Sequence, residues 1–347
     1  MPNPSMTYQT NSSIEDLAAA LRSAQSVLVT THQKPDGDAL GSVLAVVRAC
    51  RTVGVAAEGW VVDPCEGNLR SFEAGTPVRH VHPRRPELPE GEPDLVVVVD
   101  TGAWAQLEVL SSWLRPRAAR VIGFDHHARG DDVASRRVVD VACGSCTALL
   151  ARLVDALGVP LASGGDGRGR GSIAEALYMG LATDTGWFRF PNARAAEFAL
   201  AARLLEAGVD KDAMYQQIEQ SSRAERVELQ ACALASLEML SGGRIALMRL
   251  RNEDFAETGA MLEETAGIVN IPMEIAAVRA SILVVEDTQA GIVKLSFRSK
   301  PADETGAFID VNELAARFGG GGHVHAAGAK QQGTLEDVMR SVRAAVA

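Results

Sequence analysis

Short apolar runs alternate with amphipathic stretches along the first two thirds of the chain. Four of these runs are apolar almost throughout rather than at every second position: 26–31, 57–63, 94–100 and 120–125. This pattern is typical of strands in a parallel sheet that helices cover on both faces. The stretch 39–54 instead has apolar residues at helical spacing. We therefore predict an N-terminal α/β domain with a parallel sheet and helices on both faces.

The ends of this domain are marked by changes in pattern. Residues 1–11 show no apolar periodicity and are predicted to form a disordered tail. Ser12 and Glu15 have the spacing of a capping box ahead of the first predicted helix. Helical patterns return at 172–185 and 224–240. We assign residues 12–209 to the first domain and residues 210–240 to a helical linker.

The character of the sequence changes after about residue 242. "GGRIALMRL", "EIAAVRASILVVED" and "GIVKLSFRS" predict strands of a second, mixed sheet, and 310–318 and 334–346 predict helices. Residues 241–347 therefore form a smaller C-terminal α/β domain. The glycine-rich segment 162–171 is typical of a surface loop. It lacks the Gly-Lys-Ser/Thr ending of a P-loop, and phosphate binding stays open as the alternative.

Composition narrows the class of protein. A length of 347 residues suits two domains, and a net charge of −10 argues against a long duplex-binding surface. A small anionic substrate remains compatible with this charge. No run of 18 apolar residues is present, and the N-terminus lacks the pattern of a signal peptide, so we expect a cytoplasmic protein. The five cysteines are odd in number and scattered, which does not suggest a disulfide framework.

Metal-binding residue types follow the ends of several predicted strands. The candidates are His32, Asp36 and Asp38 after the first strand, Asp100 after another, Asp125, His126 and His127 after a third, and Asp184 after a helical run. Strand ends of an open α/β sheet lie at one edge, where ligands bind. Imidazoles mixed with carboxylates suit a divalent ion such as Mn²⁺. Because one ion does not need so many ligands, we expect two.

Five motifs in order resemble a known family. "HQKPDGDALGS", "VVVVDTG", "DHH" and "ATDTG" are similar to the successive motifs of the DHH phosphoesterases, and "FGGGGHVHAAG" resembles the signature of their DHHA1 domain. Together they resemble the bacterial nanoRNase/pAp phosphatases, where pAp is 3′-phosphoadenosine 5′-phosphate. The resemblance covers about residues 20–345.

The resemblance implies roles for the candidate residues. His32 and Asp36 match ligands of one Mn²⁺, Asp38, His126 and Asp184 match ligands of the other, and Asp100 matches the bridging carboxylate. His127 matches the second histidine, which faces the substrate phosphate and assists as an acid. Asp125 is expected to orient His126 or His127, because metal-bound imidazoles need such a partner.

The glycine run resists a packing explanation, since consecutive glycines stabilise no regular element. They allow backbone N–H groups to approach an anion, as in phosphate-binding nests. We therefore expect the run to bind substrate, with an imidazole and a guanidinium that binds phosphate. The predicted substrate-binding residues are Arg298, Gly319, Gly320, Gly321, Gly322, His323 and His325. Trp187 follows "ATDTG" and is interpreted either as a base-stacking residue or as a core residue.

By this resemblance the protein is an Mn²⁺-dependent hydrolase that degrades short RNA to mononucleotides and converts pAp to AMP and phosphate. The second domain would bind the far end of the substrate. One alternative is a phosphodiesterase for cyclic di-AMP or linear pApA, and another is a single-strand exonuclease of the RecJ type. A manganese pyrophosphatase should lack the glycine run, and a non-catalytic nucleotide sensor should have lost ligands. No membrane partner is expected, and a homodimer is compatible with the sequence.

Overall fold

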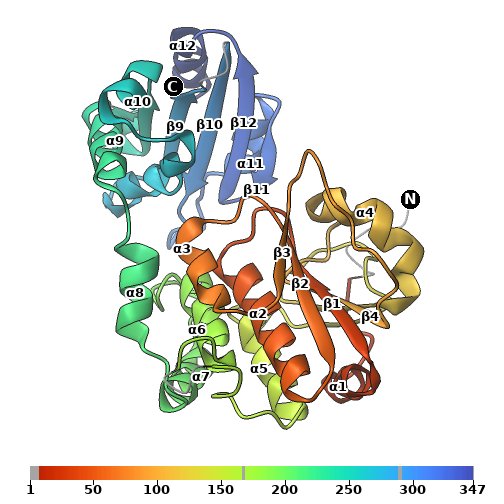
Figure 1. The fold of residues 1–347 in the computed structure, drawn as a ribbon. Coiled ribbons are helices and arrows are strands. Elements are labelled where there is room, and N and C mark those ends of the chain that lie inside the picture. Colours follow the sequence, from red (N-terminus) through yellow and green to blue (C-terminus); the bar gives the residue numbers. More distant parts are fainter. Residues whose placement is uncertain (1–7, 166–168, 288–290, 347) are drawn as a thin grey trace. The chain divides into compact units, whose positions relative to one another are not determined.

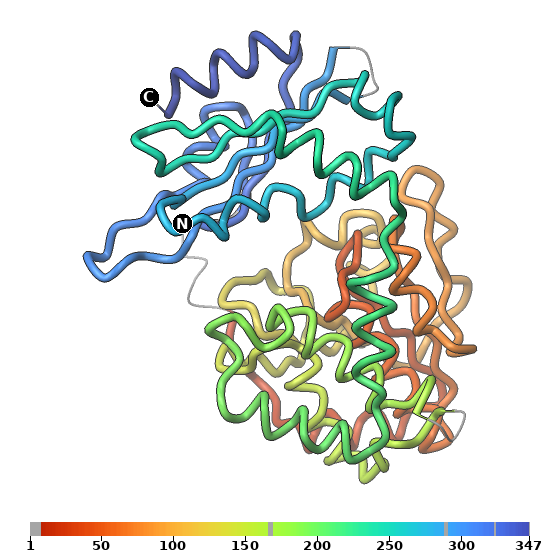
Figure 2. The backbone as a smooth tube through the Cα atoms, turned by 90° about the vertical axis from the view of Figure 1, so that its left-hand side faces the viewer, coloured from red at the N-terminus to blue at the C-terminus, as the bar shows by residue number. Residues whose placement is uncertain are grey.

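The computed structural model describes residues 8–165, 169–287 and 291–346, which divide into two compact units (Figure 1). Unit 1 comprises Met1–Ser221 and unit 2 comprises Ser222–Ala347. The chain passes from α8 (Lys211–Glu219) in unit 1 to α9 (Ala224–Ala235) in unit 2, and Figure 2 follows this course in green. The division falls within 210–240, the range in which we predicted a helical linker.

Unit 1 contains a six-stranded parallel sheet with the strand order β3-β2-β1-β4-β5-β6. The strands are β1 (Ser26–Thr30), β2 (Ala56–Val62), β3 (Val78–Val81), β4 (Leu95–Val99), β5 (Val121–Asp125) and β6 (Arg136–Val139). The parallel sheet predicted from the apolar runs is confirmed. The edge strands β3 and β6 escaped prediction because they are four residues long and only partly buried.

Helices cover both faces of this sheet. On one face α2 packs against β1, β2, α5 and α6, and its sides are buried almost all round. On the other face α4 contributes Leu110 and Trp113 to a separate core with Val96 and Val98. The helices of unit 1 are α1 (Ile14–Ser23), α2 (Gly37–Thr52), α3 (Gly67–Arg70), α4 (Glu108–Leu114), α5 (Cys146–Ala156), α6 (Ile173–Asp184), α7 (Ala195–Glu206) and α8.

Unit 2 contains a mixed sheet, as predicted, with the strand order β11-β12-β10-β9-β8-β7. Only β8 and β9 pair in parallel among its described strand pairs. Helices α11 (Val311–Ala316) and α12 (Leu335–Val346) pack on one face, and α9 and α10 (Asn252–Thr258) pack on the other. The strands are β7 (Glu238–Leu240), β8 (Ile245–Leu250), β9 (Ala280–Glu286), β10 (Ile292–Ser299), β11 (Gly321–His323) and β12 (Ala326–Gln332).

Three local predictions are wrong. The helical pattern over 224–240 ends at Ala235, because Ser236 exchanges hydrogen bonds with Arg249 and directs Glu238–Leu240 into pairing with β8. The first helix is capped by Ser13, whose side chain accepts the N–H of Asp16, and not by a box of Ser12 and Glu15.

The third wrong prediction concerns the tail. Of its residues, 1–7 lie outside the described ranges. Residues 8–11 are held in place, since Tyr8 is only 7% exposed and the backbone N–H of Asn11 donates to the carbonyl of Arg137. Within those ranges no helix combines the length and the apolar character needed to cross a membrane.

Candidate metal centre

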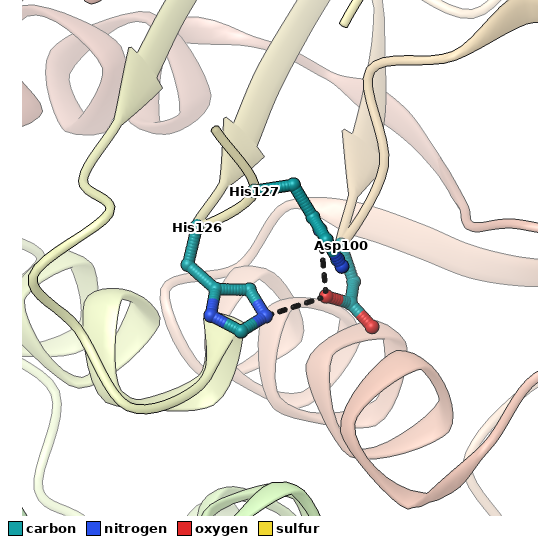
Figure 3. A group of neighbouring side chains, drawn as sticks. All are labelled: Asp100, His126 and His127. Carbon is teal, nitrogen blue, oxygen red and sulfur yellow. Dashed lines mark ion pairs between the residues drawn. The ribbon is translucent and has the colours of Figure 1, made fainter. Parts of the chain in front are cut away.

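The candidate ligands of unit 1 meet at the carboxyl-terminal edge of its sheet. Strands β1, β4 and β5 are neighbours in the sheet although they are far apart in the chain, so their ends lie side by side. The first is followed by His32. The second is followed by Asp100, and the third by His126 and His127 (Figure 3). The first turn of α2 adds Asp36, as its N-cap, and Asp38. Asp184 is the last residue of α6.

Six of these side chains, all except His127, form two groups, and the carboxylate of Asp100 lies between them. In one group, Nε2 of His32 lies 3.6 Å from Oδ2 of Asp100 and 4.0 Å from Oδ1 of Asp36. In the other, Nε2 of His126 lies 3.4 Å from Oδ1 of Asp100 and 3.7 Å from carboxylate oxygens of both Asp38 and Asp184. One oxygen of Asp100 faces each group, which is the arrangement that a bridging carboxylate requires.

Asp100 has two features that suit a cation. Its side chain is 4% exposed, yet Oδ1 has no hydrogen-bond partner within the described part of the chain. Buried carboxylate oxygens normally have a partner, so a bound ion would explain this one. Its backbone also has φ = 59°, a left-handed conformation that is uncommon outside glycine and concentrates at functional sites. The residues present therefore fit a divalent metal.

Both candidate histidines are oriented by backbone carbonyls. Nδ1 of His32 lies 3.1 Å from the carbonyl of Gln33, and Nδ1 of His126 lies 3.4 Å from that of Cys143. A donor at Nδ1 leaves Nε2 to face the carboxylates, which is how metal-binding imidazoles are usually held. Cys143 thus contributes its backbone carbonyl to the site, a role that no local pattern of the sequence reveals.

Asp38 is fixed by the N-terminus of α5. Its carboxylate accepts the N–H of Cys146 at 2.6 Å, the N–H of Thr147 at 3.0 Å and the hydroxyl of Thr147 at 2.8 Å. These donors hold a buried carboxylate that is also favoured by the positive end of the helix dipole. Sequence analysis missed Thr147, because no local pattern relates it to a residue more than 100 positions away.

The proximity of so many acids and imidazoles shifts their pKa values. Burial alone would lower the pKa of His32, but the nearby carboxylates of Asp100 and Asp36 raise it to about 9. Burial would likewise lower the pKa of His126, whereas the nearby carboxylates of Asp100, Asp38 and Asp184 raise it to about 10. Burial would raise the pKa of Asp100, but the adjacent imidazoles of His126 and His32 lower it to about 2. Asp100 is therefore ionised at neutral pH.

The pKa values of Asp38 and Asp184, the other two acids of the second group, shift upward instead. Burial, followed by the charges of Asp100 and Asp184, raises the pKa of Asp38 well above its ordinary value. Burial raises the pKa of Asp184 to about 6, against the lowering effect of His126. Buried carboxylates that repel each other are stabilised by an added positive charge. The electrostatics thus agree with the geometry in favouring a cation.

Asp125 orients His127 rather than joining either group. Its Oδ1 accepts the ring Nδ1–H of His127 at 2.7 Å and the backbone N–H groups of His126 and His127 at 2.8 and 3.1 Å. The His127 side chain is 47% exposed, so its ring is accessible to a substrate. This hydrogen bond, with the charge of Asp125, raises the pKa of His127 against the effect of burial.

The Trp187 side chain is used in packing. Its indole N–H donates to Glu219 at 2.8 Å, and its ring meets Tyr215 edge-on at 4.8 Å between centroids. It is half-buried against the main core of unit 1, which supports the core interpretation over base stacking. Phosphate binding by the loop 162–171 stays an open alternative, because residues 166–168 of this loop lie outside the described ranges.

The predicted substrate-binding residues lie in unit 2. Arg298 is on β10, where its guanidinium donates to the carbonyl of Phe297 and has no acidic partner among the residues described. Burial lowers its pKa, which indicates a partly desolvated charge. A cation in this state favours an anionic ligand. His325 Nδ1 is instead paired with the Ser299 hydroxyl at 2.9 Å.

The backbone contacts of the glycine run do not agree with the predicted anion-binding nest. The N–H of Gly319 bonds to the Ala316 carbonyl, that of Gly320 to the Ala315 carbonyl, and that of Gly322 to Oδ1 of Asn312. These N–H groups are therefore engaged within the protein and do not form an open nest for an anion. Glycine is required here for close packing: a Cβ on Gly322 would lie 2.5 Å from the carbonyl oxygen of Ala326. Gly321 and His323 continue the same strand, β11.

Comparison with known proteins supports both units. Residues 26–181 match the DHH family, N-terminal domain, and residues 244–347 match the DHHA1 domain. A Thermus thermophilus protein named bifunctional oligoribonuclease and PAP phosphatase NrnA is 28% identical over 327 residues, covering 91% of this chain and 89% of the relative. A Bacillus subtilis protein of the same name is 24% identical over 309 residues, covering 88% of each. The crystal structure of an exopolyphosphatase-related protein from Bacteroides fragilis aligns with a TM-score of 0.84 at 25% identity, covering 96% of this chain and 95% of that one.

Proposed function

This chain belongs to the DHH family and carries a C-terminal DHHA1 domain, and from that membership we propose that it hydrolyses short RNA oligonucleotides to mononucleotides and pAp to AMP and phosphate. That it is a hydrolase follows from its domains and its curated relatives. The observation that carries the specific proposal is the position of Asp100 between His32 and His126, each of which lies in a further group of possible metal ligands. Relatives named for oligoribonuclease and PAP phosphatase activity, which align over most of the chain, support the choice of substrates.

We propose that two Mn²⁺ ions bind at this centre. His32 and Asp36 would hold one, Asp38, His126 and Asp184 would hold the other, and Asp100 would contact both. Mixed imidazole and carboxylate ligands without thiolates support this type of metal. When bound, such ions supply Lewis-acid chemistry, which activates water and neutralises charge on phosphoryl oxygens.

The protein's own groups orient the reaction. Asp38 is held rigid by the N-terminus of α5, so the ligand geometry is preorganised. His127 has Nδ1 bound to Asp125, which leaves Nε2 as the nitrogen that faces a substrate oxygen. Because the pKa of His127 is raised, the ring is a suitable proton donor to the departing oxygen near neutral pH.

Unit 2 is proposed to bind the part of the substrate away from the scissile phosphate. Arg298 is the residue that best supports this role, because its half-buried guanidinium lacks an acidic partner within the described chain. The glycine run would contribute through its rigid backbone and through His323 and His325, not through the N–H groups already engaged.

A side-by-side assay tests the proposed function. Purified protein with Mn²⁺ is incubated with a dinucleotide RNA, pAp, cyclic di-AMP and pyrophosphate, and products are separated by chromatography. We expect hydrolysis of the dinucleotide and pAp, and loss of both activities in Asp184→Asn. Preferential cleavage of cyclic di-AMP would instead establish the cyclic-dinucleotide alternative. Activity on pyrophosphate alone, or none at all, would contradict the proposal.

A further inference from the structure

Tyr8 lies beside the candidate active site although it is far from it in sequence. Its side chain is 7% exposed, and its hydroxyl donates a hydrogen bond to Oδ2 of Asp125. The other oxygen of the same carboxylate, Oδ1, accepts the Nδ1–H of His127 at 2.7 Å. Tyr8, Asp125 and His127 therefore form a continuous chain of hydrogen bonds that ends at an accessible imidazole.

The Tyr8 ring lies in a slot between two glycines, Gly102 and Gly130. Gly102 follows Asp100, and Gly130 follows the two histidines. A Cβ on Gly130 would lie 2.5 Å from the Tyr8 ring, and one on Gly102 would collide with the hydroxyl end of the ring. Neither glycine has a positive φ, so space for the ring explains their identity better than backbone conformation does. The two loops are also tied directly, since the Asp131 N–H donates to the Gly102 carbonyl at 2.7 Å.

The segment that carries Tyr8 is anchored on the edge strand β6. The Thr10 hydroxyl and the backbone of Val139 exchange two hydrogen bonds of 2.8 Å. The Asn11 side chain accepts the N–H of Arg137, whose guanidinium donates to the carbonyl of Gln9. That guanidinium also lies over the Tyr8 ring, 5.5 Å from its centroid. These contacts hold Tyr8 in place independently of its bond to Asp125.

We propose that Tyr8 is a positioning residue of the phosphoesterase site, which acts through Asp125 to fix the orientation of the His127 imidazole. The inference rests on the proposed function, because it assigns Tyr8 a part in the same reaction. Without the hydroxyl, Oδ2 of Asp125 loses its hydrogen bond, and the carboxylate is held through Oδ1 alone. Its plane can then turn about Oδ1, which changes the direction in which it accepts the His127 Nδ1–H. Outer partners of this kind affect activity without touching the substrate.

Tyr8→Phe tests the proposal, because it removes the hydroxyl and keeps the ring in its slot. We expect kcat to fall roughly tenfold, the usual cost of losing such a partner, on both a dinucleotide RNA and bis(p-nitrophenyl) phosphate. KM should stay within about twofold, since the effect is on the chemical step. Tyr215→Phe is the matched control: it makes the same change at an exposed tyrosine that packs against Trp187, away from the site, and should leave kcat at the wild-type value. Equal kcat in wild type and Tyr8→Phe would overturn the proposal.

A double-mutant cycle separates positioning from a general structural effect. In the Asp125→Asn background, Tyr8→Phe should change kcat by less than about twofold, because both changes break the same chain. If the fold decreases in kcat of the two single variants instead multiply in the double variant, the proposed route through Asp125 is refuted.

A readout without turnover distinguishes this inference from the proposed function. In nitrogen–proton correlation spectra of the metal-free protein, the His127 Nδ1–H should be protected from water exchange in wild type and Tyr215→Phe but not in Tyr8→Phe. Unchanged protection would overturn the proposal even if the wild type proved inactive on every substrate.

Discussion

Asp100 has one carboxylate oxygen toward His32 and the other toward His126. Asp100→Asn keeps the side chain's shape and tolerates the left-handed backbone, but it removes the charge that both groups share. We expect kcat/KM to fall by at least about a hundredfold, and the metal content after gel filtration to drop, since loss of a ligand weakens metal binding and catalysis. Asp212→Asn, at a side chain that is 78% exposed, is the control. Full Mn²⁺ occupancy with normal activity would exclude Asp100 from the centre.

Proton release is a second prediction at the residue scale. The pKa values of His32 and His126 are raised from 6.5 to about 9 and about 10, so both rings are protonated at pH 7.5 without metal. A metal ion must replace these protons, so titration calorimetry in buffers of different ionisation enthalpy should show about two protons released. His126→Gln should release about one fewer proton, whereas His82→Gln, at an exposed ring, should not differ from wild type. Metal binding without proton release would contradict the assignment.

The same raised pKa values determine how the stability of the metal-free protein varies with pH. Since the folded-state pKa values of the two histidines exceed the unfolded value of 6.5, their stabilising effect is complete below pH 6.5. It is lost as the pH rises through about 9 to 10. The melting temperature of the metal-free protein should therefore fall between pH 7 and pH 10. Added Mn²⁺ should reduce this fall, because it supplies positive charge in place of the protons.

Among the elements of unit 2, β10 places Arg298 opposite Ser281 of β9 and Ala326 of β12. Arg298→Gln should lower kcat/KM for a dinucleotide RNA by roughly tenfold or more, because a charge-assisted bond to phosphate is lost. His323→Ala should act in the same direction. Activity on bis(p-nitrophenyl) phosphate, which has no distant end to bind, should change much less, and Mn²⁺ binding should not change. Arg340→Gln, at an exposed side chain of α12, is the control. Equal losses on both substrates would show that Arg298 does not bind the distant end.

At the scale of the whole molecule, the net charge of −10 predicts a preference for short substrates. A long strand would need a continuous basic groove along its backbone, and so acidic a chain disfavours such a groove. We expect kcat/KM to be highest for RNA of about two to four nucleotides and to fall roughly tenfold or more by about 20, equivalent to about 1.4 kcal/mol. Labelled RNAs of increasing length, assayed at one enzyme concentration, give the comparison. Efficiency that stays flat or rises with length would favour a processive exonuclease.

The sequence by itself determined the features that depend on local order. Apolar runs predicted β1, β2, β4 and β5, because strands buried on both faces need apolar side chains throughout. The change of pattern after about residue 242 predicted the second, mixed sheet. The five ordered motifs indicated the family and the identity of the candidate ligands, since residue type and spacing are properties of the chain alone.

Only the tertiary structure decided which of these groups meet. The neighbouring positions of β1, β4 and β5 bring Asp100 between His32 and His126, and the packing of α5 places Thr147 on Asp38. Tyr8 bonds to a carboxylate 117 residues away. None of these contacts has a local signal, because a side chain's distant partners depend on strand order and helix packing rather than on its neighbours in the chain.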